Sequence, residues 1–226
     1  MGVKVEGLFQ EIEPETLEVA KLYAEFYVKR CEQVGKMLKE RDPKKFEYYV
    51  KKGWWGFNLD GTLPEDRIQH QRRMRITQKA FEIALQQLQI PYIPNDPAID
   101  WRPLRERKDP LETTTKFRYD FYIPFFGEID IKNATLEKPA VSINDKDFGE
   151  ENPEFVITYQ ILDMNEPRWL KLAGFLSNSE VKEHPTSKSG NIEYYPITIE
   201  DFETKHGAEE LCDRLLFVRA QMEKAS

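Results

Sequence analysis

The sequence predicts a mixed α/β fold of the α+β kind, because helical patterns come first, strand patterns follow and another helical pattern ends the chain. Before residue 90, apolar side chains recur every three or four residues. From residue 117 onward they alternate with charged side chains, which is the period of a half-buried strand. We therefore expect a helical N-terminal extension over residues 1–60 and an α/β core over residues 61–226.

Two helices are expected in the N-terminal extension. Apolar side chains recur at helical spacing from Pro14 to about Glu40. Asp42-Pro43 predicts a stop and a restart with Asp42 as the N-cap, and a second short helix then reaches about Lys52. This aromatic-rich pair of helices either packs on the core or forms a surface for an oligomer or another partner.

A third, longer helix is expected at the start of the core. Thr62-Leu63-Pro64-Glu65 has the pattern of a capping box with a proline just inside it. The helix that follows should run from Pro64 to about Gln89, because Pro91 cannot continue it. Residues 94–115 are rich in proline and charge and predict a long loop.

The strands follow this loop. Residues 117–123 alternate between apolar and polar side chains, Pro124-Phe125-Phe126-Gly127 predicts a turn, and residues 128–132 alternate again. The later elements expected from the same patterns are strands at 155–162 and 169–175, a short helix capped by Ser177, an edge strand at 195–199 and a terminal helix at 208–224.

Composition excludes several classes of protein. The 226 residues are 40 % hydrophobic, which suits a globular domain and not a disordered chain. No stretch approaches the roughly 20 apolar residues of a membrane span. Two distant cysteines exclude a disulfide scaffold and favour a reducing, cytoplasmic location. The three histidines lack metal-ligand spacing, and no Gly-x-Ser-x-Gly elbow, P-loop or histidine dyad is present.

The net charge of −7 is distributed unevenly. Residues 61–120 hold 11 basic and 9 acidic side chains, whereas residues 141–226 hold 9 basic and 17 acidic ones. The basic groups of the middle segment either form a solvated helix face and a charged loop, or a stripe that contacts phosphates. The candidate nucleic-acid-binding residues are Arg67, Arg72, Arg73, Arg75, Lys79, Arg102, Arg105, Arg107 and Lys108.

Carboxylates gather on the predicted hairpin. A register centred on Phe125 places Asp120 opposite Asp130 and Tyr122 opposite Glu128. Opposed carboxylates repel each other unless they share a cation or a proton. Oxygen ligands on a rigid scaffold suit Mg²⁺ or Mn²⁺. The alternative is a half-exposed sheet whose charges face solvent.

These residues resemble a known family. Asp120 followed by Asp130-Ile131-Lys132, after a helix and before further strands, is similar to the core of the PD-(D/E)xK nuclease superfamily. The resemblance covers about residues 64–200 and implies a restriction-endonuclease-like core, with a central mixed sheet flanked by helices. Tyr119 precedes Asp120 in place of proline, and the triplet begins with Asp in place of the commoner Glu.

The resemblance implies a metal-dependent hydrolase of phosphodiester bonds. Asp120 and Asp130 would hold Mg²⁺ or Mn²⁺ together with the carbonyl of Ile131, and Lys132 would position or activate the attacking water. Glu82, on the preceding helix, would join the metal shell, and Glu128 is the alternative if Glu82 is misoriented. We therefore expect a nuclease that binds nucleic acid, with DNA favoured over RNA.

Other readings remain open at this stage. A non-catalytic nucleic-acid-binding or assembly module could keep the same fold without the chemistry. A homodimer through the N-terminal helices would bring two sites to a double strand. No membrane partner is expected.

Overall fold

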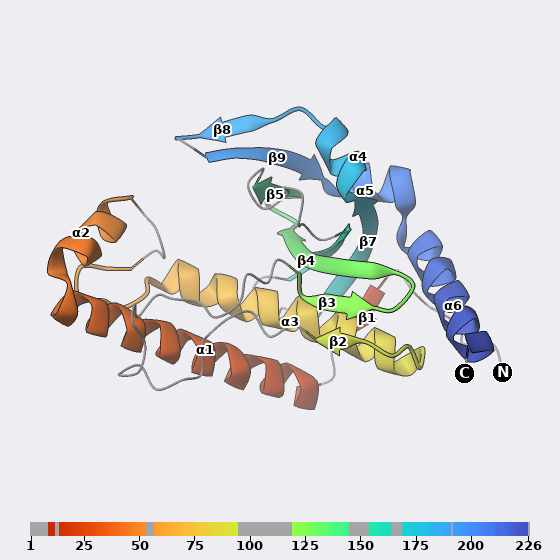
Figure 1. Ribbon diagram of the computed structural model, residues 1–226, viewed down its shortest axis with the longest axis horizontal. Coiled ribbons are helices and arrows are strands. Elements are labelled where there is room, and N and C mark those ends of the chain that lie inside the picture. Colours follow the sequence, from red (N-terminus) through yellow and green to blue (C-terminus); the bar gives the residue numbers. More distant parts are fainter. Residues whose placement is uncertain are drawn as a thin grey trace. The chain divides into compact units, whose positions relative to one another are not determined.

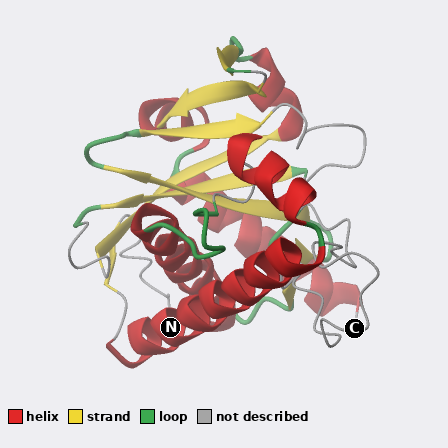
Figure 2. Cartoon of the chain, turned by 90° about the vertical axis from the view of Figure 1, so that its left-hand side faces the viewer, coloured by secondary structure: helices red, strands yellow, loops and turns green. Residues whose placement is uncertain are grey.

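The computed structural model shows the mixed α/β class that the sequence predicts, with a mixed sheet flanked by helices (Figures 1 and 2). The structure describes residues 9–11, 14–52, 57–94, 119–144, 154–163, 169–190 and 192–225. The described chain divides into two compact units. The helical unit contains the described residues between Glu18 and Arg75, and the sheet unit contains β1 (Phe9–Glu11), residues 76–94 and those from 119 onward.

The helical unit contains the two helices expected at the N-terminus. Helix α1 covers Pro14–Arg41 and α2 covers Pro43–Lys52, with Asp42 between them. The carboxylate of Asp42 accepts a hydrogen bond from the backbone N–H of Lys45 at 3.0 Å, as expected of an N-cap. The apolar core of this unit contains Val28, Cys31, Leu38, Phe46, Phe57 and Leu63.

Helix α3 (Glu65–Gln87) begins differently from the prediction. Thr62 does not form a capping box, because its hydroxyl donates to the carboxylate of Asp60 at 2.6 Å and accepts from Asn58 at 3.0 Å. The carbonyl of Pro64 instead accepts the first helical hydrogen bonds, from Arg67 and Ile68. The division between the two units falls within α3, between Arg75 and Ile76.

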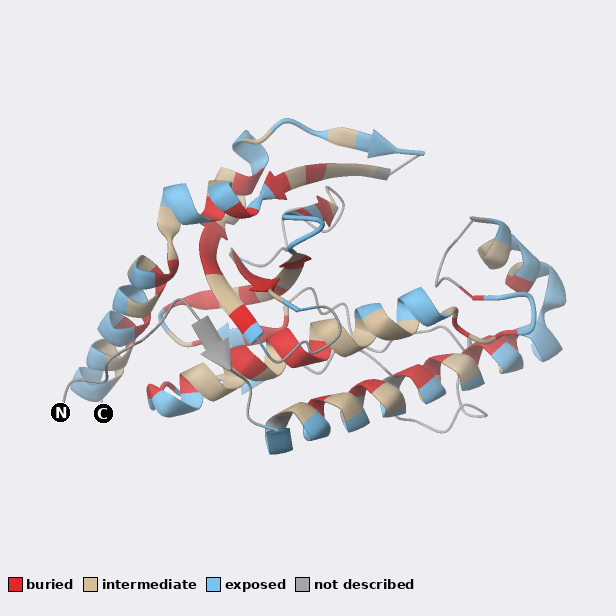
Figure 3. Cartoon of the chain, turned by 180° about the vertical axis from the view of Figure 1, so that it is seen from behind, coloured by how far each residue is buried: buried red, intermediate tan, exposed pale blue. Residues whose placement is uncertain are grey.

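A six-stranded mixed sheet forms the centre of the sheet unit (Figure 1). Its order is β1-β7-β6-β4-β3-β2, in which β4 and β6 are parallel and the other neighbours are antiparallel. Most of its strand residues are buried (Figure 3). The remaining strands are β2 (Ile93–Pro94), β3 (Phe121–Ile123), β4 (Gly127–Thr135), β6 (Phe155–Ile161) and β7 (Trp169–Ser177).

A second sheet has three strands in the order β5-β9-β8. Strand β9 (Ile192–Thr198) is central here, so the edge strand expected at 195–199 is corrected. Its neighbours are β5 (Ala140–Asn144) and β8 (Ser187–Ser189), and neither was predicted. Buried side chains of β5 and β9 share an apolar cluster with β6, β7 and the helix that follows β9.

Three helices complete the sheet unit. Helix α4 (Asn178–Glu183) begins with the predicted cap, in which Ser177 and Glu180 form a capping box. Helix α5 (Ile199–His206) was not predicted, and α6 (Ala208–Ala225) confirms the terminal helix. Gly207, between α5 and α6, pairs with Gly174 of β7. A Cβ added to Gly174 would lie 2.1 Å from the carbonyl oxygen of His206, so this close approach requires glycine at position 174.

Both cysteines lie within the described residues. Cys31 and Cys212 are both free, so they form no disulfide. None of the described helices combines the length and the apolar character that crossing a bilayer requires.

Candidate functional site

The β3–β4 hairpin has the predicted pairing of Tyr122 with Glu128, but its ladder begins at Phe121 and does not include the predicted pair of Asp120 and Asp130. Tyr122 pairs with Glu128 and Phe121 with Ile129, so the turn is centred on Phe125. Burial alternates along β4, since Ile129 and Ile131 are fully buried whereas Glu128, Asp130 and Lys132 are partly exposed. Asp130 and Lys132, the first and last residues of the Asp130-Ile131-Lys132 triplet, therefore lie on the same face of β4.

Asp120 lies immediately before β3 and is only 8 % exposed. Its backbone N–H donates to the carbonyl of Ile129 at 2.7 Å. Its carboxylate Oδ2 accepts a hydrogen bond from the N–H of Ile131 at 2.7 Å. The side chain therefore supplies an acceptor to β4 just before β3 begins, and it is fixed to Ile131, the middle residue of the triplet.

Gln78 of α3 is the second partner of this carboxylate. Its Nε2 donates to Asp120 Oδ1 at 2.6 Å. Gln78 lies four residues before Glu82, on the same face of the helix. Sequence reasoning missed Gln78 because it selected acidic residues on α3. The available signal was its position one turn before Glu82.

Asp130 and Lys132 form an ion pair along β4. Nζ of Lys132 lies 2.6 Å from Oδ2 of Asp130, and the two side chains are 25 % and 13 % exposed. The triplet thus places an ammonium group directly on a carboxylate that was predicted to hold metal. This pairing fixes the ammonium near any group that Asp130 binds.

A buried hydroxyl lies next to this pair. Thr158 of β6 is the register partner of Lys132, and Val156 is the partner of Asp130. Thr158 has no exposed surface, and its Oγ1 has no hydrogen-bond partner among the described residues. A buried hydroxyl without a partner is costly, so Thr158 is a candidate ligand-contacting group beside the triplet.

Glu82 does not join these residues. One of its carboxylate oxygens accepts from the Tyr92 hydroxyl at 2.8 Å, and the other pairs with Lys79 at 2.5 Å. Within the described parts of the chain, no three His, Cys, Asp or Glu side chains are close enough to hold a metal ion together. The expectation that Glu82 completes a carboxylate cluster is therefore not met in this arrangement.

Glu128 lies near a second carboxylate, that of Glu154. Burial raises the pKa of Glu128, and the nearby charge of Glu154 raises it further. In the parallel register Glu154 precedes Phe155, the partner of Ile129. Glu128 therefore lies in a like-charge environment that a cation or a proton would relieve.

The predicted basic stripe is only partly available to phosphates. Arg75 is 8 % exposed, and Arg72 pairs with Glu25 at 3.5 Å. Burial lowers the pKa of Arg73, whereas Arg67 is exposed. These four arginines belong to the helical unit, while Lys79 pairs with Glu82 in the sheet unit. The remaining candidates, Arg102, Arg105, Arg107 and Lys108, lie outside the described residues.

Comparisons with known proteins identify no relative of this chain. No family model matches the sequence. No curated protein and no solved structure matches it either.

Proposed function

We propose that this protein is a metal-dependent nuclease that hydrolyses phosphodiester bonds in nucleic acid, with DNA as the favoured substrate. The observation that supports the proposal is the hydrogen bond from Ile131 to Asp120, because it brings the isolated aspartate to the Asp130-Ile131-Lys132 triplet. A sheet strand and a helix residue, Gln78, hold the aspartate in place.

The donor chemistry fits Mg²⁺ or Mn²⁺. Asp120 and Asp130 offer hard carboxylate oxygens. The carbonyl of Ile131 and the hydroxyl of Thr158, which pairs with Lys132 in the sheet, are further candidate oxygen atoms. Mg²⁺ is often held by only one or two carboxylates and keeps several waters. Two carboxylates can therefore suffice, although no cluster of three is present among the described residues.

Each residue would have a separate task. Asp120 and Asp130 would hold the ion, which lowers the pKa of bound water and stabilises charge on the phosphate. Lys132 would hold the attacking water or the developing negative charge. Gln78 would orient Asp120, and the fully buried Thr158 hydroxyl would accept or donate one hydrogen bond with an enclosed water beside Lys132.

A cleavage assay tests the proposal. The full chain is incubated with single- and double-stranded DNA and RNA in Mg²⁺, Mn²⁺ or EDTA. Cleavage should require the divalent ion and should disappear in Lys132→Ala and Asp130→Asn. Lys138→Ala is the matched control, because Lys138 is an exposed lysine just beyond the same strand. Undiminished cleavage by Asp130→Asn contradicts the proposal.

A non-catalytic nucleic-acid-binding module is the second candidate. Two observations favour it: Lys132 is paired with Asp130, and Glu82 is engaged by Tyr92 and Lys79. In that case the chain binds nucleic acid equally well in Mg²⁺ and EDTA and cleaves none of the substrates.

A further inference from the structure

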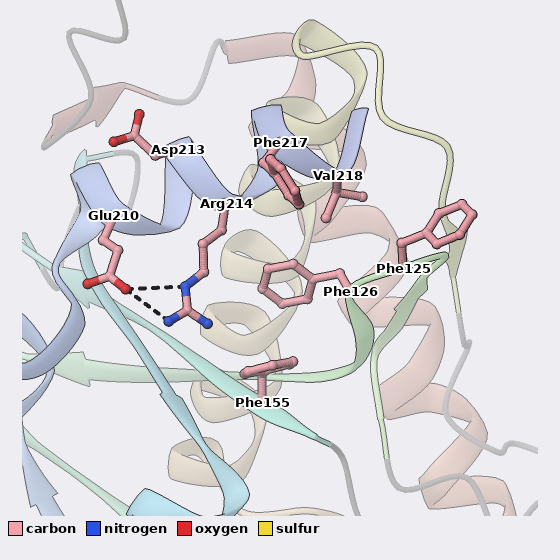
Figure 4. Close-up of a pocket in the computed structure, with 8 residues that line it drawn as sticks. All are labelled: Phe125, Phe126, Phe155, Glu210, Asp213, Arg214, Phe217 and Val218. Carbon is pink, nitrogen blue, oxygen red and sulfur yellow. Dashed lines mark hydrogen bonds and ion pairs between the residues drawn. The ribbon is translucent and has the colours of Figure 1, made fainter. Parts of the chain in front are cut away.

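A pocket of about 440 Å³ lies beside the turn of the same hairpin (Figure 4). Its lining comes from the β3–β4 turn, the start of β6 and one side of α6. Most of this lining is aromatic or aliphatic, and three charged side chains on α6 complete it. The lining residues are Phe125, Phe126, Phe155, Phe217, Val218, Glu210, Asp213 and Arg214.

Phe125 has a backbone conformation that favours a smaller residue. The N–H of Phe126 donates to the carbonyl of Ile123 at 3.0 Å, which closes a turn with Pro124 and Phe125 at its centre. Phe125 has φ 63°, in the left-handed region where glycine is preferred at this position of a turn. Turn formation alone would therefore favour glycine, and the phenyl ring is 69 % exposed.

The other aromatic side chains of the pocket include both exposed and buried rings. Phe217 of α6 is 65 % exposed, whereas Phe126 is 9 % exposed. The ring centroids of Phe126 and Phe155 are 4.6 Å apart. The pocket therefore combines exposed rings that a ligand can reach with packed rings beneath them, which is typical of a binding surface.

Arg214 is fixed inside this aromatic lining. Its Nε and Nη2 donate to Glu210 Oε1 at 3.2 and 3.0 Å, and its guanidinium lies 4.7 Å from the ring centroid of Phe175. In Figure 4 the guanidinium points toward Phe126 and Phe155. No described residue accepts a hydrogen bond from Nη1, so this nitrogen can donate to a ligand.

The charges select the kind of ligand. Glu210 and Asp213 outweigh Arg214 by one formal charge, which disfavours a free anion, while the guanidinium itself disfavours a cation. A flat neutral ring with hydrogen-bond acceptors on its edge satisfies the phenyl rings and Nη1 together. Nucleobases have this chemistry, and guanine offers arginine two adjacent acceptors, O6 and N7.

We infer that this pocket binds one unpaired nucleobase, guanine in preference to the others, from the nucleic-acid strand held at the β3–β4 hairpin. The inference rests on the proposed nucleic-acid substrate. Phe126 and Asp130 are four residues apart on the hairpin, which is about 13 Å at roughly 3.3 Å per residue. Phe155 is the register partner of Ile129, whose side chain lies on the opposite face of β4 from that of Asp130. A strand bound at Asp130 would therefore pass around the turn of the hairpin to place a base in the pocket, which makes the pocket a specificity determinant.

Fluorescence anisotropy in EDTA tests this inference without cleavage. The probes are short single-stranded DNAs that contain one guanine in a thymine background, or an abasic position instead of that guanine. The full chain should bind the guanine probe about tenfold more tightly. Phe125→Gly should remove this difference and leave the melting temperature unchanged or raised, since glycine suits φ 63°. Leu136→Ala, at an exposed residue beyond β4, should change neither quantity.

The outcomes separate this inference from the proposed function. Equal affinity for the guanine and abasic probes overturns the inference that the pocket binds a base, even if cleavage in Mg²⁺ persists. Guanine-dependent binding without any cleavage supports the pocket and contradicts the nuclease. If Phe125→Gly binds both probes as the unmodified chain does but dissociates a dimer in sedimentation, the pocket is a protein interface and the inference is wrong.

Discussion

Oδ2 of Asp120 lies 2.7 Å from the backbone nitrogen of Ile131 and accepts its hydrogen bond. Asp120 lies just before β3, so a side chain satisfies a backbone donor of β4 there. The same hydrogen bond fixes the Asp120 carboxylate at Ile131, the residue that follows Asp130 on β4. Fold stability and the candidate chemistry therefore depend on one hydrogen bond, and two substitutions can separate them.

Asp120→Ala should destabilise the fold more than Asp120→Asn, whereas both variants should be inactive. Alanine leaves the buried Ile131 N–H without its acceptor, so the free energy of unfolding should fall by about 1–3 kcal/mol. Asparagine keeps an acceptor for Ile131 and can pair with Gln78 after rotation of that amide, so the loss should be about 1 kcal/mol. Both variants should lose cleavage. Denaturant unfolding and the cleavage assay measure the two effects, and an active Asp120→Asn protein contradicts the proposed metal ligand.

Gln78→Glu should make the stability depend on pH. The new carboxylate would lie against Asp120, where Gln78 Nε2 is now 2.6 Å away. The pair must share a proton, so one folded pKa rises above the unfolded value of about 4. The variant should therefore approach the stability of the unmodified chain at acid pH and lose stability as pH rises through the raised pKa.

Thermal unfolding between acid and neutral pH measures this change. Gln87→Glu is the control, because Gln87 is an exposed residue at the end of the same helix. If both variants have the same pH dependence, the contact between Gln78 and Asp120 is not formed in solution.

The hairpin could be predicted because its signals are local. Side chains of a strand alternate with a period of two, and the turn from Pro124 to Gly127 leaves few registers that keep Ile129 and Ile131 buried. The second sheet lacks such a signal. Ala140 pairs with Thr198, far along the chain, and β5 is too short to be recognised without that partner.

The candidate site was predicted in part, for a related reason. The spacing of Asp120 and Asp130-Ile131-Lys132 predicts two of the acidic residues, and the family resemblance adds Glu82. Gln78 and Glu82 share one face of α3, so the position of the helix along its axis decides which of them meets the hairpin, and local sequence does not determine that position. Tyr92 engages Glu82 from β2, a strand of two residues that has no periodicity to detect.

A histidine between two carboxylates should give the protein a stability optimum in mildly acid solution. His206 Nε2 lies 2.7 Å from Glu180, and Nδ1 lies 2.8 Å from Glu210. Both ring nitrogens can donate only in the protonated form. Burial lowers the pKa of His206, but the hydrogen bonds to Glu210 and Glu180 outweigh it and raise the pKa above 6.5.

Glu180 responds in the opposite direction. Burial raises its pKa, but hydrogen bonds from Ser177 and His206 lower it to about 2. Its stabilisation is present above pH 4.5 and is lost as pH falls toward 2. The contribution of His206 is complete below pH 6.5 and is lost as pH rises through its raised pKa.

The melting temperature should therefore be highest between about pH 4.5 and 6.5. Glu180→Gln should flatten both sides of this profile while keeping the helix cap, since glutamine also serves in a capping box. Glu183→Gln, at an exposed residue of the same helix, should retain the profile. A Glu180→Gln profile that matches the unmodified chain would show that the cluster does not couple folding to protonation.

Thr158→Val should raise stability and lower cleavage. Valine has nearly the shape of threonine and removes a fully buried hydroxyl that has no partner among the described residues. We expect a gain of about 1 kcal/mol in the free energy of unfolding. Thr135→Val is the matched control on β4, where the hydroxyl accepts from the N–H of Lys138 at 3.1 Å, so that variant should lose about 1 kcal/mol.

The two measurements on Thr158→Val distinguish a structural role from a functional one. Thr158 is the register partner of Lys132, so a hydroxyl that binds an enclosed water of the candidate site should affect cleavage. A more stable protein with reduced cleavage supports that role. A more stable protein with full cleavage limits Thr158 to packing, and a less stable one shows that the hydroxyl is hydrogen-bonded in solution.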